Sequence, residues 1–543
     1  MITISRHSVP LMLLLALAPS SGLVLAAERG DASGWPGLGA LPERAPRADR
    51  QVMWVFLSGR GPAADREVLP ADERATWRRE VRGRGNRLSE PDRKISRSHL
   101  RSLQASGARV RVQSRWFNAV SVQATPDQLD QIRQLPFVRE IRPVALGRRK
   151  PEPRPVGARP GPAPRLEYGG SFNQLEMIGV PAAHEAGLSG ADIRVLMIDT
   201  GYYKDHVAFG AGRIMAEWDF INQDGQTQNQ PGDPESQHRH GTATATALGG
   251  HWPGQLYGPA YNCHFLLAKT EDTSSETPVE EDYYLAALEW GENLGADVAS
   301  ASLGYTDWYT WPDLDGQTAL VTLAVDAAVG LGMTVVVSAG NARNDEWGHI
   351  GTPADAFGVI SVGAVDELGQ LTWFSSPGPT YDGRIKPEVS AQGLNVAAAG
   401  WEDPSSLRWF AGTSLSCPLV AGCAALLLEA HPLWTPAQVR AALMSTADRA
   451  AQPDNDYGWG IIDLPAALQA FPEPGPVNIA VVGNQVQLSW PEDAYALYRI
   501  YRADHPWGPF TLLGQTTSNS WSGPSQLNQG SGFFRVQGLV DLP

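Results

Sequence analysis

Hydrophobic residues in the middle of the chain occur in short, nearly uninterrupted runs, separated by segments long enough to form helices. Continuous apolar runs are typical of parallel strands buried on both faces, with helices as the crossover connections between them. We therefore predict an α/β domain over residues 167–472, with a mostly parallel sheet and helices on both faces. The runs that predict its strands are "IRVLMID", "HFLLAK", "ADVASASL", "TVVVSAG" and "GVISVGAV".

The pattern differs on either side of this domain. Residues 51–145 read strand–helix–strand–strand–helix–strand, which predicts a small α+β domain, with Thr125 before Pro126 marking the start of its second helix. Residues 146–166 are dominated by Pro, Gly and Arg and predict an extended linker accessible to proteases. Residues 475–543 alternate with period two between Gly, Pro and Asn turns, which predicts a small β-sandwich.

The first residues have the layout of a secretory signal peptide. A basic residue, Arg6, precedes the apolar run "LMLLLALA", and small residues end at "VLAA". We expect residues 1–26 to be removed by cleavage after Ala26. The apolar run is too short to span a bilayer comfortably, which argues against a membrane anchor. The sequence therefore predicts a secreted protein, extracellular or periplasmic, that has no membrane association once the signal is removed.

Composition agrees with a folded, exported chain. Its 543 residues are 43% hydrophobic and 19% charged, which suits several globular domains. With only three cysteines the chain is not a disulfide scaffold. At most one bridge is expected, and Cys417 is not expected to pair with Cys423, because residues six apart on one helix project in different directions.

Charge is distributed unevenly along the chain. Residues 27–150 contain 25 Lys and Arg against 14 Asp and Glu, a net charge of +11, whereas residues 151–543 carry a net charge of −27. A basic segment of this kind either binds nucleic acid or docks onto an acidic surface. In an exported protein we favour docking onto the acidic remainder of the same chain, and expect no nucleic-acid partner.

Two candidate catalytic residues lie in the first half of the α/β domain. Asp199 ends the run "IRVLMID", and a carboxylate there needs partners because an unpaired buried charge is costly. Asp192 and Asp205 are nearby alternatives, but neither ends a buried strand. His240 lies in "QHRHGTATATALGG", where Gly241 and other small residues let the following helix pack closely against the sheet.

The segment "HRH" also permits a metal site. Asp233 and Glu235 are close in sequence and could serve as additional ligands. No further strong ligand cluster accompanies them, so we expect no catalytic metal.

Two further candidates follow later segments. Asn341 in "SAGN" is either a turn residue or a side-chain amide that points at developing negative charge, a donor worth about 3–4 kcal/mol of transition-state stabilisation. Ser414 in "AGTSLSCP" opens an apolar helix, so it is either a helix cap or a nucleophile.

The candidates have complementary roles. A serine hydroxyl is a weak nucleophile until a base takes its proton, and that base, a histidine, needs an oriented carboxylate. Asp199, His240 and Ser414 supply these three groups. Asn341 and a backbone N–H at the start of the helix would form an oxyanion hole. The set predicts nucleophilic acyl transfer.

On these segments the chain resembles the subtilisin-like serine peptidases. "VLMIDTG", "HGT", "SAGN" and "GTSLSCPLVAG" are similar to the signature segments of that family, and "WFNAVSV" resembles part of its inhibitory propeptide. The C-terminal segment resembles a fibronectin type III-like module. The resemblance implies a secreted serine endopeptidase that hydrolyses peptide bonds in proteins through an acyl-enzyme. Residues 27–145 would be a prodomain that inhibits the cleft of its own chain until cleavage in the linker, by self-processing.

The resemblance also implies site roles by position. Asp199 orients His240, which is general base and then acid, Ser414 attacks, and Asn341 donates to the oxyanion. The substrate would pair as an added strand with one cleft wall and contact a second wall. The residues of these walls are Ser302, Leu303 and Gly304, and Ser338, Ala339 and Gly340. No cofactor is required; the family often binds structural calcium, but the sequence shows no distinct calcium loop.

The chain departs from the family pattern at a few positions. Residues 243–246 are Ala-Thr-Ala-Thr, Leu415 replaces the usual Met, Ser416-Cys417 replace small apolar residues, and Gln392 stands where Pro is common. We expect none of these to touch a reacting group. The alternative hypothesis is a catalytically silent secreted binding or adhesion protein on a peptidase fold.

Overall fold

The computed structural model forms two compact units, residues 42–471 and residues 472–543 together with 1–41. The predicted signal peptide lies outside the described residues, apart from the two-residue strand β1 (Ile2–Thr3). The described residues are 2–3, 50–61, 71–83, 93–144, 146–147, 152–154, 166–273, 279–307, 309–471, 477–482, 485–491, 495, 497–503, 511–524 and 533–539.

The larger unit is built on a sheet of seven parallel strands in the order β16-β15-β14-β13-β7-β11-β8. This confirms the predicted fold class. The two strands without a predicted run are β8 and β16, and β8 is a half-exposed edge strand. The strands are β7 (Arg194–Asp199), β8 (Ile214–Asp219), β11 (His264–Lys269), β13 (Val298–Ala301), β14 (Thr334–Ser338), β15 (Ile360–Val365) and β16 (Val389–Gln392).

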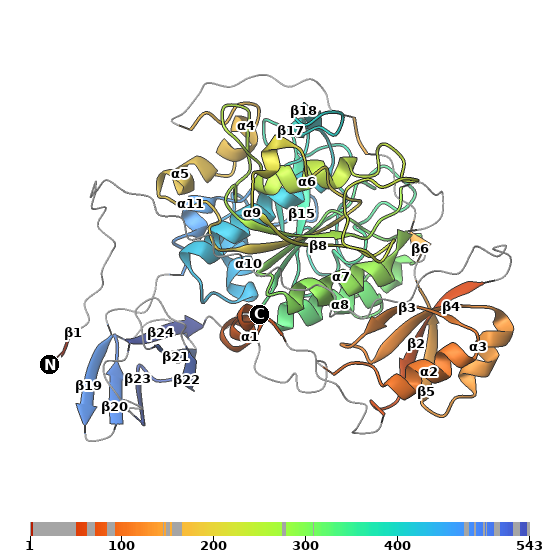
Figure 1. The fold of residues 1–543 in the computed structure, drawn as a ribbon. Coiled ribbons are helices and arrows are strands. Elements are labelled where there is room, and N and C mark those ends of the chain that lie inside the picture. The colour runs from red at the N-terminus through yellow and green to blue at the C-terminus, as the bar shows by residue number, and fades with distance from the viewer. Residues whose placement is uncertain are drawn as a thin grey trace, which may run out of the picture. The chain divides into compact units, whose positions relative to one another are not determined.

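Helices cover both faces of this sheet (Figure 1). On one face α6 (Arg239–Gly249) packs against α9 (Thr413–Ala430), and on the other α7 (Glu281–Asn293) packs against α8 (Leu320–Gly330). The remaining elements of the peptidase region are α4 (Phe172–Glu176), α5 (Val180–Glu185), α10 (Pro436–Ser445), α11 (Leu464–Ala467), the 3-10 helices Val207–Phe209 and Trp311–Asp313, and the strands β9 (His251–Trp252), β10 (Leu256–Tyr257), β12 (Val279–Glu280), β17 (Val396–Ala399) and β18 (Leu407–Phe410).

Helix α9 lies in the centre of the core. It is buried almost along its whole length and contacts β13, β14, β15 and β16. Among the described helices it is long and apolar enough to cross a membrane, but 89% of that stretch is buried inside the domain, as expected for a core helix. Cys417 and Cys423 on α9, and Cys263, are buried and unbridged.

The prodomain forms a four-stranded antiparallel sheet in the order β3-β4-β2-β5 with two helices, as predicted. Thr125 caps the second helix, because its side chain accepts from the backbone N–H of Gln128 while the Gln128 side chain accepts from Thr125. The elements are β2 (Gln51–Leu57), α2 (Arg97–Ala105), β3 (Arg109–Ser114), β4 (Ala119–Ala124), α3 (Pro126–Arg133), β5 (Val138–Pro143) and β6 (Leu146–Gly147), which pairs with β12.

One helix of the prodomain was not predicted. Helix α1 (Glu73–Arg82) is inserted between β2 and α2 and has the sequence "ERATWRREVR". Its buried face includes Arg78 and Arg82. Hydrophobic periodicity could not reveal this helix, because arginines occupy positions where a packed helix usually has apolar residues.

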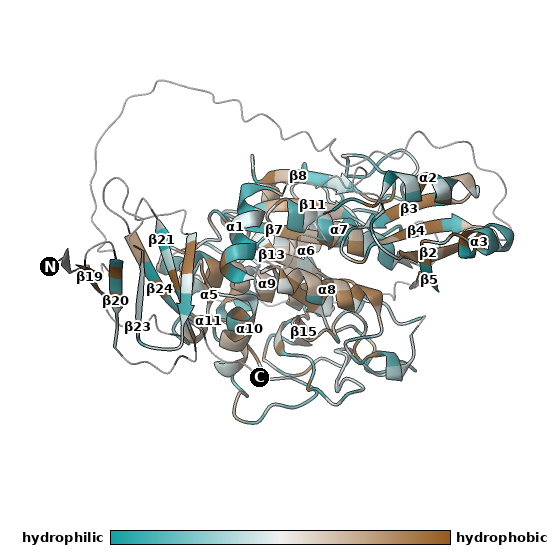
Figure 2. Ribbon diagram, turned by 90° about the horizontal axis from the view of Figure 1, so that it is seen from below, coloured by the Kyte–Doolittle hydropathy of each residue, from teal (hydrophilic) through white to brown (hydrophobic). Residues whose placement is uncertain are grey.

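The C-terminal unit consists of two antiparallel sheets, one of four strands and one of three. Apolar residues from both sheets share one core, which gives the sandwich arrangement (Figure 2). Its strands are β19 (Asn478–Val482), β20 (Gln485–Ser489), β21 (Leu497–Ala503), β22 (Thr511–Thr516), β23 (Ser520–Pro524) and β24 (Phe533–Leu539), with β1 beside β19.

Candidate active site

Asp199 and His240 form a direct hydrogen bond. Asp199 is the last residue of β7, His240 lies in the first turn of α6, and Asp199 Oδ1 is 2.6 Å from His240 Nδ1. Because an ionised carboxylate only accepts hydrogen bonds, the proton lies on Nδ1 and Nε2 is the ring nitrogen available as a base.

The buried carboxylate of Asp199 has further donors. Its Oδ1 accepts from the backbone N–H of Thr200 at 2.7 Å, and its Oδ2 accepts from Thr244 Oγ1 at 2.9 Å. These bonds offset the cost of burying a charge. Thr244 is one of the departures from the family pattern, so the expectation that none of them touches a reacting group is wrong.

A glycine allows α6 to approach β7 closely. A Cβ on Gly241 would lie 2.2 Å from the carbonyl oxygen of Gly201 and 3.1 Å from Asp199 Cβ. Any side chain at this position would push α6 away from the sheet. The absence of a side chain after His240 therefore sets the distance between the imidazole and the carboxylate.

Ser414 lies in the first turn of α9 and lines the same pocket as His240. Pro418, four residues later, has no N–H to donate to the Ser414 carbonyl. That carbonyl accepts instead from Ser302 Oγ at 2.8 Å. Because Pro418 leaves this carbonyl without a helical donor, a hydrogen bond to the segment after β13 holds the Ser414 backbone instead.

Asn341 is oriented by the start of α9. Its Oδ1 accepts from Thr413 N at 2.9 Å and from Thr413 Oγ1 at 3.0 Å. Because Thr413 holds the amide oxygen, the NH₂ group of Asn341 points away from Thr413. A Cβ on Gly412, which has φ of +139°, would come within 3.3 Å of Asn341 Nδ2, so glycine suits this position.

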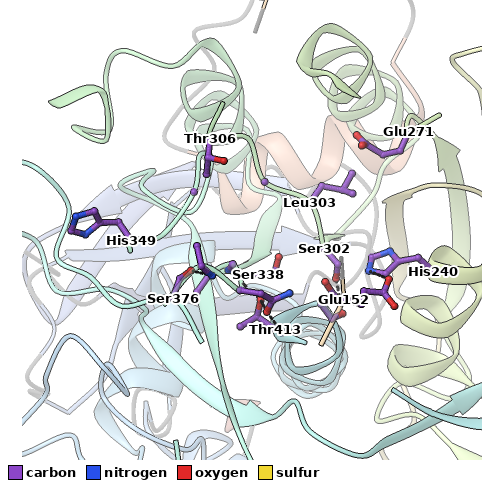
Figure 3. A pocket seen from close by; sticks show the side chains of 17 residues that line it. Glu152, His240, Glu271, Ser302, Leu303, Thr306, Ser338, His349, Ser376 and Thr413 are labelled. Carbon is purple, nitrogen blue, oxygen red and sulfur yellow. Dashed lines mark hydrogen bonds and ion pairs between the residues drawn. The ribbon is translucent and has the colours of Figure 1, made fainter. Parts of the chain in front are cut away.

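The six residues predicted for the two cleft walls line the pocket, together with residues that were not predicted. Ser302, Leu303 and Gly304 follow β13. Ser338 is the last residue of β14, Ala339 and Gly340 follow it, and all six residues line the pocket. Sequence reasoning missed other lining residues (Figure 3). These are Glu271, Thr306, Ala342, His349, Gly351, Ser376 and Thr413. One of them, Thr413, opens α9 within the segment "GTSLSCPLVAG".

A short piece of the predicted linker lies in this pocket. Glu152 lines it, with Oε1 3.7 Å from His240 Nε2 and Oε2 3.4 Å from the guanidinium of Arg239 (Figure 3). Pro153 is buried beside Gly412. The chain that connects prodomain and peptidase domain therefore passes over the catalytic histidine candidate.

The alternative residues have other partners. Asp205 accepts from the side chain of Gln228, and Asp233 pairs with Lys269 at 2.8 Å. The described residues contain no group of three or more His, Cys, Asp or Glu side chains placed to hold a metal ion. The "HRH" segment thus places His240 in the pocket.

Comparisons with known proteins agree with this fold. Residues 190–460 match the model of the Subtilase family, and residues 54–155 match a Peptidase S8 propeptide domain described for Bacteroidota. The chain is 31% identical over 302 residues to subtilisin of Bacillus pumilus, covering 54% of this chain and 98% of that relative. It is also 31% identical over 302 residues to subtilisin E of Bacillus subtilis strain 168, covering 70% of that relative.

A solved structure has the same fold. Fervidolysin from Fervidobacterium pennivorans, described as a keratinolytic enzyme related to subtilisin, matches with a TM-score of 0.56 over 89% of this chain and 70% of that one, at 21% identity. The sheet, the propeptide match and these relatives define a serine endopeptidase, a hydrolase that carries its own propeptide domain. The chain belongs to the subtilase family.

Proposed function

We propose that this protein is a secreted subtilase, made as a zymogen, in which Asp199, His240 and Ser414 form the catalytic triad. The observation that carries the proposal is the 2.6 Å bond that orients His240 on Asp199, with His240 and Ser414 lining the same pocket. The signal-like N-terminal sequence supports secretion, and the propeptide match supports the zymogen.

The reaction follows from these groups. His240 Nε2 takes the proton of Ser414 Oγ as the oxygen bonds to the carbonyl carbon of the scissile peptide, and Asp199 stabilises the imidazolium. The resulting oxyanion accepts hydrogen bonds from Asn341 Nδ2 and a backbone N–H at the start of α9. His240 then returns the proton to the leaving amine as the C–N bond breaks, which leaves an acyl-enzyme on Ser414 that water hydrolyses.

The two pocket walls position the substrate. An extended peptide pairs with Ser302, Leu303 and Gly304 as an added strand, and the residue before the scissile bond lies against residues 338–340. This mode of binding uses backbone groups, so it suits proteins and peptides of many sequences. No cofactor takes part in the reaction.

The linker keeps the zymogen inactive by occupying the cleft. The Glu152 carboxylate lies beside Nε2, the atom that must accept the serine proton. Cleavage within or near residues 146–166 releases this segment, and we propose that the enzyme makes the cut itself. The prodomain is thereby an inhibitor of its own chain.

The experiment compares the wild-type chain with Ser414→Ala on a gel and with a fluorophosphonate probe. We expect the wild type to lose its prodomain and bind the probe, and the variant to remain full length and unlabelled. A wild-type chain that fails to label would support the silent binding protein. Equal loss of the prodomain in both chains would show that another protease makes the cut.

A further inference from the structure

Among the described residues, two parts of the prodomain contact the peptidase domain, its sheet and helix α1. The sheet packs on α7, where Arg111 Nε is 3.0 Å from Asp282 Oδ2 and the Ser121 hydroxyl donates to the same oxygen at 2.6 Å. Helix α1 lies away from that sheet, against the ends of α7 and α8 (Figure 1). Ionic contacts dominate under α1.

Three arginines converge on Glu292, near the end of α7. Arg79 holds the carboxylate with two hydrogen bonds, Nε to Oε1 at 2.8 Å and Nη2 to Oε2 at 2.6 Å, and Arg78 donates to Oε1 as well. Arg115, from the turn between β3 and β4, donates to Oε2 at 3.0 Å. The carboxylate is fully buried among them, so its interaction with these charges is only weakly screened.

The other two arginines of α1 donate hydrogen bonds to Asp297, which lies directly before β13. Arg74 donates to Oδ2 from Nε at 2.9 Å and from Nη2 at 2.6 Å, and Arg82 donates to Oδ1 at 2.8 Å. The backbone N–H of Arg194 adds a bond at 3.0 Å. All four arginines of one short helix thus engage two buried carboxylates of the peptidase domain.

The surface under α1 has the shape of a helix-binding site. Gly295 and Gly332, with φ of +77° and +88°, form the turns after α7 and α8. A Cβ on Gly295 would lie 3.0 Å from Arg74 Cβ, and one on Gly332 would lie 2.9 Å from Arg82 Cβ. Arg78 also donates to the carbonyl oxygens of Ala296 and Leu331. Backbone shape and charge therefore both match an arginine-bearing helix.

This place is remote from the cleft. Asp297 precedes β13 at its amino end and Ser302 follows it at its carboxyl end, so the two lie roughly 16 Å apart along the strand at about 3.3 Å per residue. A cut in the linker removes no contact of Glu292 or Asp297. Burial alone would raise the pKa of the Glu292 carboxyl, but Arg78 and Arg79 more than offset it and hold the pKa below its ordinary value.

We propose that Glu292 and Asp297 form a dedicated binding site for an arginine-bearing helix, that α1 occupies it in the zymogen, and that this site sets how long the cut prodomain stays bound. The inference rests on the proposed zymogen. Release of the prodomain then leaves the two carboxylates as an acidic site on the surface of the mature enzyme.

The test uses the full chain carrying Arg78→Gln and Arg79→Gln together, with Arg133→Gln as the matched control on an exposed helix of the same prodomain. After processing, the delay before peptidase activity emerges measures release of the cut prodomain. Truncating one partner of a buried charge pair is costly, so we expect release at least about tenfold faster than in the control. Equal release from the double variant and the control would overturn the proposal.

A second measurement separates this proposal from the proposed function and from misfolding. In the uncut Ser414→Ala chain, backbone amides of α1 should be protected from hydrogen exchange, and adding the two Arg→Gln changes should remove that protection while β4 stays protected. Unprotected α1 amides in the parent chain would contradict the binding site even if the enzyme is active. Failure of the wild type to label with the fluorophosphonate would instead contradict the proposed function.

Discussion

Thr244 donates a hydrogen bond from Oγ1 to Asp199 Oδ2 at 2.9 Å, one turn of α6 beyond His240. The Asp199 carboxylate thus accepts one hydrogen bond from the helix that carries His240 and another from the backbone N–H of Thr200. This arrangement fixes the direction in which Asp199 faces the imidazole. It makes Thr244 a positioning residue for the proposed triad.

Thr244→Val should therefore lower kcat by about tenfold or more, because a hydrogen bond to a charged group contributes about 1.5–3 kcal/mol. KM should stay unchanged, since Thr244 does not line the pocket. Steady-state kinetics on a peptide substrate measures both. Thr244→Ser keeps the hydroxyl and should restore kcat; if Ser and Val variants are equally impaired, packing and not the hydrogen bond is responsible.

Asn341→Asp tests the oxyanion donor. Aspartate retains the oxygen that accepts from Thr413, but it has no N–H to donate. We expect kcat to fall by about 10²–10³ with little change in KM, as for loss of one oxyanion donor in subtilisin. Thr413→Val removes one of the bonds that orient Asn341 but leaves the amide in place, so it should lower kcat less than Asn341→Asp. A full-activity Asn341→Asp enzyme would contradict the assignment.

His238 should make the protein less stable in mild acid. Burial lowers the pKa of His238 to about 4, from an ordinary value of 6.5. Between these values the unfolded chain binds a proton that the folded chain does not, so the stability present above pH 6.5 decreases as the pH falls toward 4.

Thermal unfolding of the Ser414→Ala chain between pH 7 and pH 4 measures this dependence. His238→Asn keeps an acceptor for the Asn229 backbone N–H and removes the titration. We expect the melting temperature of this variant to fall less steeply with acid than that of its parent. Parallel slopes would show that other groups account for the acid sensitivity.

The carboxylates around Lys269 should not need a metal ion, so a chelator should have no effect on them. Its ammonium lies 2.9 Å from Asp219 Oδ2 and 2.8 Å from Asp233 Oδ2, so a cation of the protein itself already neutralises these carboxylates. Lys269→Met should cost about 3–5 kcal/mol, because it leaves a buried charge without its partner. Chelator should leave the melting temperature of the wild type unchanged.

The matched control is Lys204→Met, which breaks the more exposed pair with Glu217 and should cost much less. Both costs come from urea unfolding in the Ser414→Ala background. A drop in the wild-type melting temperature with chelator, reversed by calcium, would show that a metal site elsewhere stabilises the fold.

The sequence was sufficient to predict the central sheet, because five of its strands are continuous apolar runs. The same pattern placed Asp199 at a strand end, where the structure has it, whereas Asn341 lies three residues beyond the end of β14. It did not reveal β8, whose exposed positions interrupt the run, or α1, whose buried face includes arginines. Apolar patterning detects burial against other apolar groups and does not detect burial against charge.

The position of Glu152 was hidden for a different reason. It belongs to a Pro- and Arg-rich segment that was interpreted only as a linker, and nothing in its composition indicates contact with His240. The role of Thr244 was similarly obscured, because the structure alone shows which face of α6 its hydroxyl occupies. Both contacts depend on how distant segments meet.

Ser414 is mounted on α9, an element enclosed by the sheet and by α6. Local unfolding at the surface on heating should therefore leave the Ser414 hydroxyl in place, and only global unfolding should displace it. Inactivation and global melting should coincide on one temperature curve, which would make residual turnover a direct reporter of the folded fraction.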